Sequence, residues 1–106
     1  MNKETKEKLE QLQNLEQNIN SILSQRQQFQ SQQLEIENAM EQVKDTEKVF
    51  RIIGNIMVAS KKEEVKKELR EKLDIVELRL KTLEKQEAKF REKASELQKD
   101  VMKEIK

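Results

Sequence analysis

Two stretches of the chain carry apolar residues at spacings that alternate between three and four, and this repeat constrains the fold more than any other feature. Each stretch covers more than four heptads, which is typical of the a and d positions of a coiled coil. The first seam consists of Leu12, Leu15, Ile19, Ile22, Arg26, Phe29, Gln33, Ile36, Met40 and Val43. The second consists of Leu69, Leu73, Val76, Leu80, Leu83, Glu87, Phe90, Ala94, Leu97 and Val101. Each stretch is therefore predicted to form a long helix that packs along one seam.

Composition supports long helices over a globular core. Of the 106 residues, 41% are charged and 34% are apolar, and the only aromatic residues are three Phe. This supplies too little large apolar surface for a thick core, while a single Gly and no Pro suit uninterrupted helices. Disorder is the alternative that composition alone allows, and the apolar repeat argues against it.

Between the two seams the apolar period changes to that of strands. Val49–Ile53 and Ile56–Ala59 are almost wholly apolar and flank Gly54–Asn55, a dipeptide suited to a type II′ turn with Gly first. We predict one domain over residues 1–106, mainly α, with helix 1 at about 4–45, a β-hairpin at about 48–59 and helix 2 at about 61–105. Ser60 and Glu63 are expected to form a capping box at the start of helix 2.

The turn position also predicts how the helices pair. If the two helices run antiparallel on either side of Gly54–Asn55, Leu12 stands opposite Leu97 and Phe29 stands opposite Leu80. These are a-to-d pairs, as an antiparallel coiled coil requires. The expected fold is a long antiparallel two-helix coiled coil with the hairpin at the end opposite the termini.

The hairpin is apolar on both faces, so two slender helices at one end cannot cover it. We assign Val49, Ile53 and Met57 to one face and Phe50, Ile52, Ile56 and Val58 to the other. Other chains are expected to cover these faces, with hairpins joined edge to edge into a closed β-barrel platform. The predicted assembly residues are Val49, Phe50, Ile52, Ile53, Gly54, Ile56, Met57 and Val58. The alternative is a hairpin that folds back onto its own helices.

At the other end, the seam runs into polar partners. Thr5 and Lys8 stand opposite Glu104 and Val101, so the apolar groups here are expected to be poorly covered. Flexible Leu, Met and Ile side chains suit weak contact with many different sequences. The candidate client-binding residues are Leu9, Leu12, Leu15, Ile19, Leu97, Val101, Met102 and Ile105. Ordinary packing at the end of a seam explains the same residues equally well.

Several classes of function are excluded by residues that the chain lacks. It has no His and no Cys, so zinc sites, disulfides and thiol chemistry are not expected, and one Gly leaves no phosphate-binding loop. We therefore expect no catalytic residues, no metal and no cofactor. The lysines of the second half alternate with glutamates without stacking aromatics, so no nucleic-acid binding is expected. With no leader-like segment and no apolar run of about 20 residues, the chain is expected to be soluble and cytoplasmic, without membrane contact.

The order of long helix, apolar hairpin and long helix resembles that of prefoldin, and the residues match as well. The segment from residue 49 to 97 resembles beta-type subunits of archaeal kind in five features: Val49–Phe50, Gly54, Ile56–Val58, Glu77–Leu80 and Gln86–Glu87. The first predicted helix resembles that of these subunits only in its general sequence pattern and not in particular residues. The linker before the hairpin lacks the Pro-containing acidic turn of many such subunits, and the seams have polar breaks.

The resemblance implies an ATP-independent chaperone. Its expected form is a hexamer of two alpha-type and four beta-type subunits, in which the coiled-coil tips hold unfolded clients and pass them to a group II chaperonin. The alternative function is a structural coiled coil that oligomerises or tethers other proteins without chaperone activity, because that role requires only the heptads.

Overall fold

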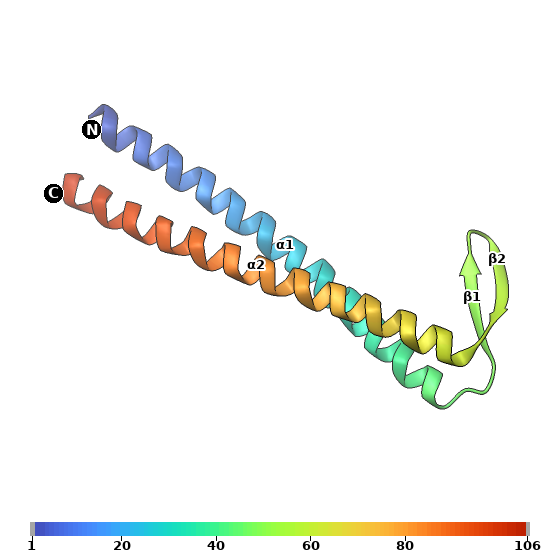
Figure 1. The fold of residues 1–106 in the computed structure, drawn as a ribbon. Coiled ribbons are helices and arrows are strands. Elements are labelled where there is room, and N and C mark those ends of the chain that lie inside the picture. The colour runs from blue at the N-terminus through green and yellow to red at the C-terminus, as the bar shows by residue number, and fades with distance from the viewer. Residues whose placement is uncertain (1, 106) are drawn as a thin grey trace. The chain divides into compact units, whose positions relative to one another are not determined.

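Both long seams form helices in the computed structural model, which describes residues 2–105. Helix α1 spans Lys3–Lys44 and helix α2 spans Lys62–Ile105, and between them lie strands β1 (Val49–Ile53) and β2 (Ile56–Ser60) (Figure 1). Alternating three- and four-residue spacings place the apolar side chains of each helix on one stripe of its surface. This stripe is buried where the helix packs against another helix. In the described part of the chain, neither helix is long and apolar enough to cross a membrane.

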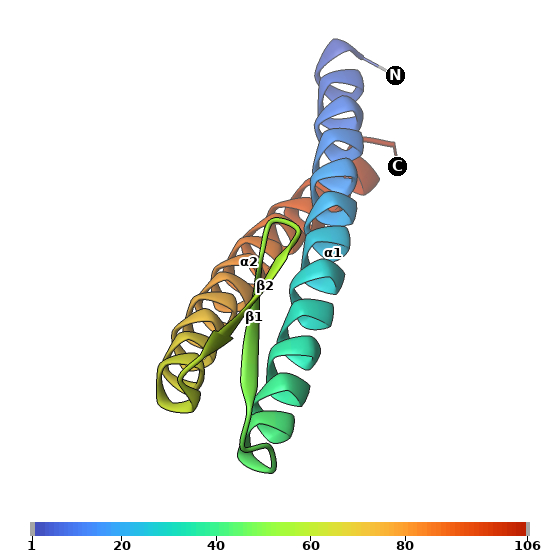
Figure 2. The same ribbon diagram turned by 90° about the vertical axis from the view of Figure 1, so that its right-hand side faces the viewer.

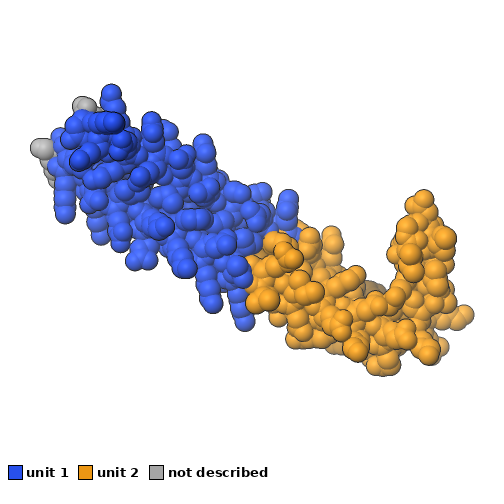
Figure 3. Space-filling view, turned by 45° about the horizontal axis from the view of Figure 1, so that its top comes forward, with its two compact units in different colours: residues 1–28, 81–106 blue, residues 29–80 orange. Residues whose placement is uncertain are grey.

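The chain forms two compact units (Figure 3). Unit 1 comprises Met1–Gln28 and Lys81–Lys106, and unit 2 is Phe29–Leu80. Each unit contains part of both helices, and unit 2 also contains the hairpin.

The predicted seams form the core of each unit. In unit 1 the buried apolar side chains are those of Leu12, Ile19, Ile22, Leu83 and Val101; in unit 2 they are those of Val43, Leu73, Val76 and Leu80. Every other seam position is half-buried, and most residues between them are exposed. The helices of unit 1 run antiparallel, because Thr5 near the start of α1 contacts Glu104 near the end of α2. The coiled-coil prediction is confirmed.

The hairpin turn lies where the sequence predicts it. Strands β1 and β2 pair antiparallel, with Ile53 opposite Ile56 on either side of Gly54–Asn55 (Figures 1 and 2). Gly54 has a φ of 59°, which is open to Gly because it has no Cβ, and Asn55 keeps a negative φ. A positive φ at the first central residue alone is the pattern of a type II′ turn.

The start of α2 differs from the prediction. Ser60 is the last residue of β2, where it pairs with Val49, and the N–H of Val65 donates to the carbonyl of Lys61 at 3.1 Å. The carbonyl of Lys61 accepts this first bond of the helix, so Lys61 and not Ser60 occupies the N-cap position. The predicted Ser60–Glu63 capping box is therefore wrong.

Side-chain hydrogen bonds satisfy free backbone groups at both ends of α1, where the sequence has no Gly or Pro. At its start, Asn2 Oδ1 accepts a hydrogen bond from the N–H of Thr5 at 2.8 Å, which is an N-cap. At its end, the Thr46 hydroxyl donates to the Gln42 carbonyl at 2.8 Å and Lys62 Nζ donates to the Lys44 carbonyl at 3.0 Å. These bonds satisfy carbonyls that have no partner inside the helix.

A matched pair of leucines on α2 tests whether the seam supplies the stability. Leu80 is 9% exposed and Leu78 is 65% exposed. We expect Leu80→Ala to lower the free energy of unfolding by about 2–3 kcal/mol, because it leaves a cavity in a core one layer thick. Leu78→Ala is expected to change it by less than about 0.5 kcal/mol. Urea denaturation followed by circular dichroism measures both, and equal losses would contradict the seam as the source of stability.

Candidate functional site

The hairpin exposes nearly all of its large apolar side chains. Six of them are between 41% and 74% exposed: Phe50, Ile52, Ile53, Ile56, Met57 and Val58. Val49 is half-buried. In Figure 3 the hairpin projects from the rest of unit 2. It is therefore not folded back onto its own helices, and the six side chains are available to other chains.

The strand register corrects the predicted faces of the hairpin. Directly opposed residues lie on the same face of a sheet, and faces alternate along each strand. Ile52 pairs with Met57 and Phe50 pairs with Ala59, so these four share one face. Ile56 and Val58 lie on the other face, with Val49 and Ile53, and the assignment of Met57 to that face is wrong. The face of Phe50, Ile52, Met57 and Ala59 is entirely apolar and entirely exposed.

An ion pair joins the second face to α2. Arg51, which lies opposite Val58, contacts the carboxylate of Glu68. Between β1 and α2 lies a groove of about 350 Å³ whose lining includes Ile53, Val65 and Leu69. The ion pair thus connects the face of Arg51 and Val58 to α2, and Ile52 of the opposite face also borders the groove.

Near the chain ends, polar side chains of α1 contact a polar side chain of α2 across the seam of unit 1. The Thr5 side chain is hydrogen bonded to Glu104, and Lys8 Nζ lies 2.6 Å from Glu104 Oε1. The hydrogen bond from Lys8 and then that from Thr5 hold the pKa of the Glu104 carboxyl below its usual range. The same bond to Glu104 raises the pKa of Lys8. Thr5 is only 2% exposed and Val101 only 5%, so the expectation that Val101 is poorly covered is wrong.

All eight predicted client-binding residues belong to unit 1, but they differ in accessibility. Leu12, Ile19 and Val101 are buried, whereas Leu9, Leu15 and Leu97 are half-buried. Met102 and Ile105 are 56% and 59% exposed. Only the last two present most of their surface to solvent.

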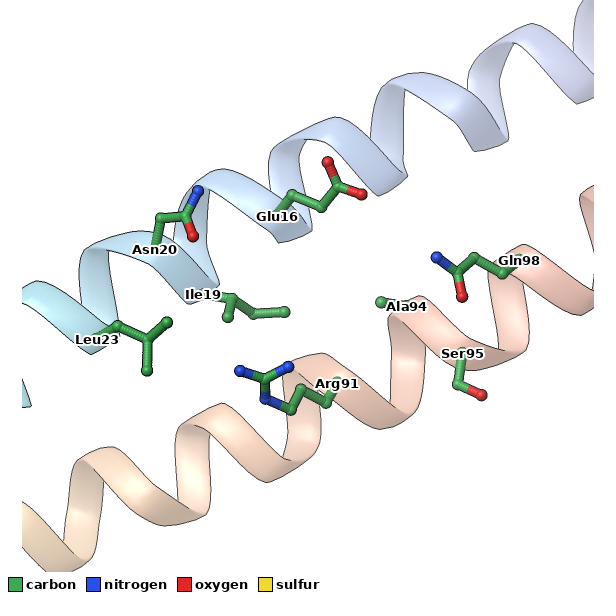
Figure 4. A pocket seen from close by; sticks show the side chains of 8 residues that line it. All are labelled: Glu16, Ile19, Asn20, Leu23, Arg91, Ala94, Ser95 and Gln98. Carbon is green, nitrogen blue, oxygen red and sulfur yellow. The ribbon is translucent and has the colours of Figure 1, made fainter.

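Two open grooves of about 450 Å³ each lie along the helices of unit 1. The first is lined by Ile19, Leu23 and Ala94, with Glu16, Asn20, Arg91, Ser95 and Gln98 (Figure 4). Figure 4 shows Ile19 of α1 pointing toward α2, where Ala94 fills little of the space. The second is lined by Leu15 and Leu97, with Gln11, Asn14, Asn18, Lys93, Glu96 and Asp100. Three predicted client-binding residues, Leu15, Ile19 and Leu97, therefore line grooves.

Arg26 and Glu87, the polar residues in the unit 1 seam, contact one another. Arg26 Nη1 lies 2.6 Å from Glu87 Oε1, and Arg91 Nε donates to Glu87 Oε2 at 2.8 Å. Hydrogen bonds from Arg91 and then Arg26 hold the pKa of Glu87 below its usual range. A charged pair at one point of an apolar seam disfavours shifted pairings, in which each charge would face a leucine or isoleucine.

Comparison with known proteins decides the family. A family model described as "Prefoldin subunit" matches residues 6–106. The chain belongs to the prefoldin family. "Prefoldin subunit beta" of Archaeoglobus fulgidus is 43% identical over 91 residues, which cover 83% of this prefoldin chain and 78% of that protein. The same subunit of Methanospirillum hungatei is 34% identical over 89% of this chain and 81% of its own length.

A solved structure supports the same assignment. The crystal structure of the prefoldin beta subunit from Thermococcus strain KS-1 matches with a TM-score of 0.90 and 28% sequence identity, and the match covers 96% of this chain and 92% of that one. Within prefoldin, the chain is of the beta type, as the hairpin and second-helix motifs indicated.

Sequence patterns missed three polar contacts of this prefoldin chain: Arg51 with Glu68, Thr5 with Glu104, and Arg26 with Glu87. The expected register put Thr5 opposite Glu104, which was a usable signal. It put Arg26 opposite Leu83, so the contact with Glu87 depends on the reach of the long Arg side chain to the next turn of α2. No local signal linked Arg51 to Glu68.

Proposed function

We propose that this prefoldin chain is a subunit of an ATP-independent chaperone that holds non-native polypeptides and delivers them to a group II chaperonin. In the proposed complex, two alpha-type and four beta-type subunits join through their hairpins. The clients are held at the ends of the coiled coils. A cytoplasmic location is part of this proposal.

The exposed apolar hairpin is the observation that best supports the proposed assembly of subunits. Six large apolar side chains, each at least 41% exposed, form a surface that a chain working alone would leave in water. Burying such side chains contributes about 1.5–3 kcal/mol each, and pairing the strand edges would satisfy their backbone groups. The apolar face of Phe50, Ile52 and Met57 supports burial against other subunits.

Client holding has separate support in unit 1. Met102 and Ile105 expose apolar surface near the end of α2, and the grooves of unit 1 have partly apolar linings. Both are on helices rather than in a closed pocket, which suits binding without a fixed client shape. With one Gly and no His or Cys, nothing in the sequence suggests nucleotide hydrolysis as the source of energy.

A structural tether is the rival function, and a holding assay separates the two. A chemically denatured client is diluted into buffer containing the chain assembled with an alpha-type partner, and aggregation is followed by light scattering. We expect stoichiometric complex to suppress the scattering without ATP, and addition of a group II chaperonin with ATP to restore folding of the held client. Scattering equal to that of the client alone would rule out the chaperone and leave the tether.

A further inference from the structure

The side chains that a mild oxidant attacks are confined to four methionines. The chain has no Cys, His, Trp or Tyr, so the methionine thioethers are the groups that react first with a peroxide. Three of the four lie in the described part of the chain. Met40 is half-buried in the seam of unit 2, whereas Met57 and Met102 are 65% and 56% exposed. Oxidation of the free chain is therefore expected chiefly at Met57 and Met102.

Met57 belongs to the exposed apolar face of the hairpin. It lies directly opposite Ile52, and Phe50 is its diagonal neighbour on the same face. It does not line the groove between β1 and α2. The proposed assembly buries this face against other subunits, so the Met57 thioether is accessible in the free chain and covered in the complex.

A peroxide changes this side chain from apolar to polar. The sulfur lone pair attacks one oxygen of hydrogen peroxide, the O–O bond breaks, an S–O bond forms, and the other oxygen leaves as water with both protons. Sulfur loses two electrons and the peroxide gains them. The S=O group of the product is a strong hydrogen-bond acceptor, but the side chains around it, those of Phe50, Ile52 and Ala59, have no donor. Burying the sulfoxide in a subunit contact therefore costs free energy.

We propose that Met57 is an oxidation site through which peroxides control assembly. The sulfoxide keeps a free chain out of the complex, and assembly protects the thioether from oxidation. The change is reversible, because a sulfoxide reductase uses two thiols to remove the oxygen as water and forms one disulfide among those thiols. This inference rests on the proposed assembly through the hairpin and adds its control by the redox state of one side chain.

Met102 provides a comparison within the same chain. Its exposed fraction is similar to that of Met57, but it lies near the end of α2 in unit 1, whereas the hairpin belongs to unit 2. A sulfoxide at Met102 is expected to leave assembly unchanged. Loss of assembly on oxidation should therefore follow the fraction of Met57 that is oxidised and not the fraction of Met102.

The test treats the free chain with hydrogen peroxide, removes the excess with catalase and titrates the chain into an unoxidised, fluorescently labelled alpha-type partner. Fluorescence anisotropy measures binding, and mass spectrometry of tryptic peptides measures oxidation, since Lys and Arg residues separate Met40, Met57 and Met102. We expect binding about tenfold to a hundredfold weaker, as for one polar group buried without a partner. Methionine sulfoxide reductases A and B with dithiothreitol are expected to restore it.

Matched variants assign the effect to one sulfur. Met57→Leu keeps an apolar side chain without a thioether and is expected to bind the partner equally well before and after peroxide. Met40→Leu with Met102→Leu keeps Met57 and is expected to stay as sensitive as the wild type. This double variant also decides the matter if Met57→Leu fails to bind the partner. Circular dichroism of each oxidised chain shows whether the helices remain intact.

A second measurement compares oxidation rates in the free chain and in the complex. We expect Met57 to be oxidised about tenfold more slowly in the complex, while Met102 keeps its rate. Equal rates for Met57 in both states would contradict protection by assembly.

The outcomes separate this inference from the proposed function. Full binding of the partner by a chain whose Met57 is oxidised would overturn the inference alone, as would resistance of Met57 to peroxide in the free chain. Equal loss of binding by oxidised Met57→Leu and oxidised wild type would overturn it as well. Absence of a complex with the alpha-type partner before any oxidation would overturn the proposed assembly itself.

Discussion

Replacing Ile52 and Ile56 by lysine is expected to reduce the assembled complex to chains of 12.7 kDa while the helical content stays the same. The two side chains are 74% and 66% exposed and lie on opposite faces of the hairpin, so the pair of substitutions places a charge on each face. A lysine buried at a subunit contact without a partner must lose its hydration, which outweighs the apolar burial that it replaces. Size-exclusion chromatography with light scattering gives the mass, and circular dichroism gives the helix content.

The control uses the same kind of substitution on the helices. Leu34 and Ile75 are exposed apolar residues of unit 2 outside the hairpin, at 61% and 54%. Leu34→Lys with Ile75→Lys adds the same charge and is expected to leave the mass unchanged. If the hairpin variant keeps the full mass in the presence of an alpha-type partner, assembly does not depend on the hairpin.

The helices and the hairpin turn were predictable because their signals are local. A seam repeats every seven residues, and a Gly-first dipeptide between two β-branched runs fixes both the turn and the strand register. The seam prediction is borne out even at Arg26 and Glu87, which are half-buried as seam positions should be. The hairpin's exposure also followed from counting its apolar side chains against the helices that could cover them.

Features that depend on contacts between residues distant in the sequence were harder to predict. Ser60 is a good N-cap by residue type, but its pairing with Val49 extends β2 and moves the helix start to the next residues. Val101 was expected to lie against polar residues and hence to be exposed. A polar residue can instead be buried in a seam when its polar atoms have partners, as Thr5 does with Asn2 and Glu104.

Removing residues 1–10 and 97–106 is expected to abolish suppression of client aggregation while leaving the assembled mass, corrected for the shorter chains, unchanged. The deletion takes away exposed Met102 and Ile105 together with Leu97 and Gln98 of the grooves. It leaves all of unit 2, including the hairpin. The holding assay by light scattering and the mass measurement are made on the same sample.

The truncation and the hairpin variant are informative together because they should fail in opposite ways. The truncated chain is expected to assemble without holding clients, and the hairpin variant is expected to lose assembly with unit 1 intact. Binding by several coils at once gains strength from effective concentration, so single chains of the hairpin variant should bind an unfolded probe more weakly than the complex does. Unchanged suppression by the truncated complex would place client binding elsewhere on the molecule, whereas loss of its assembly would mean that the chain ends also hold the subunits together.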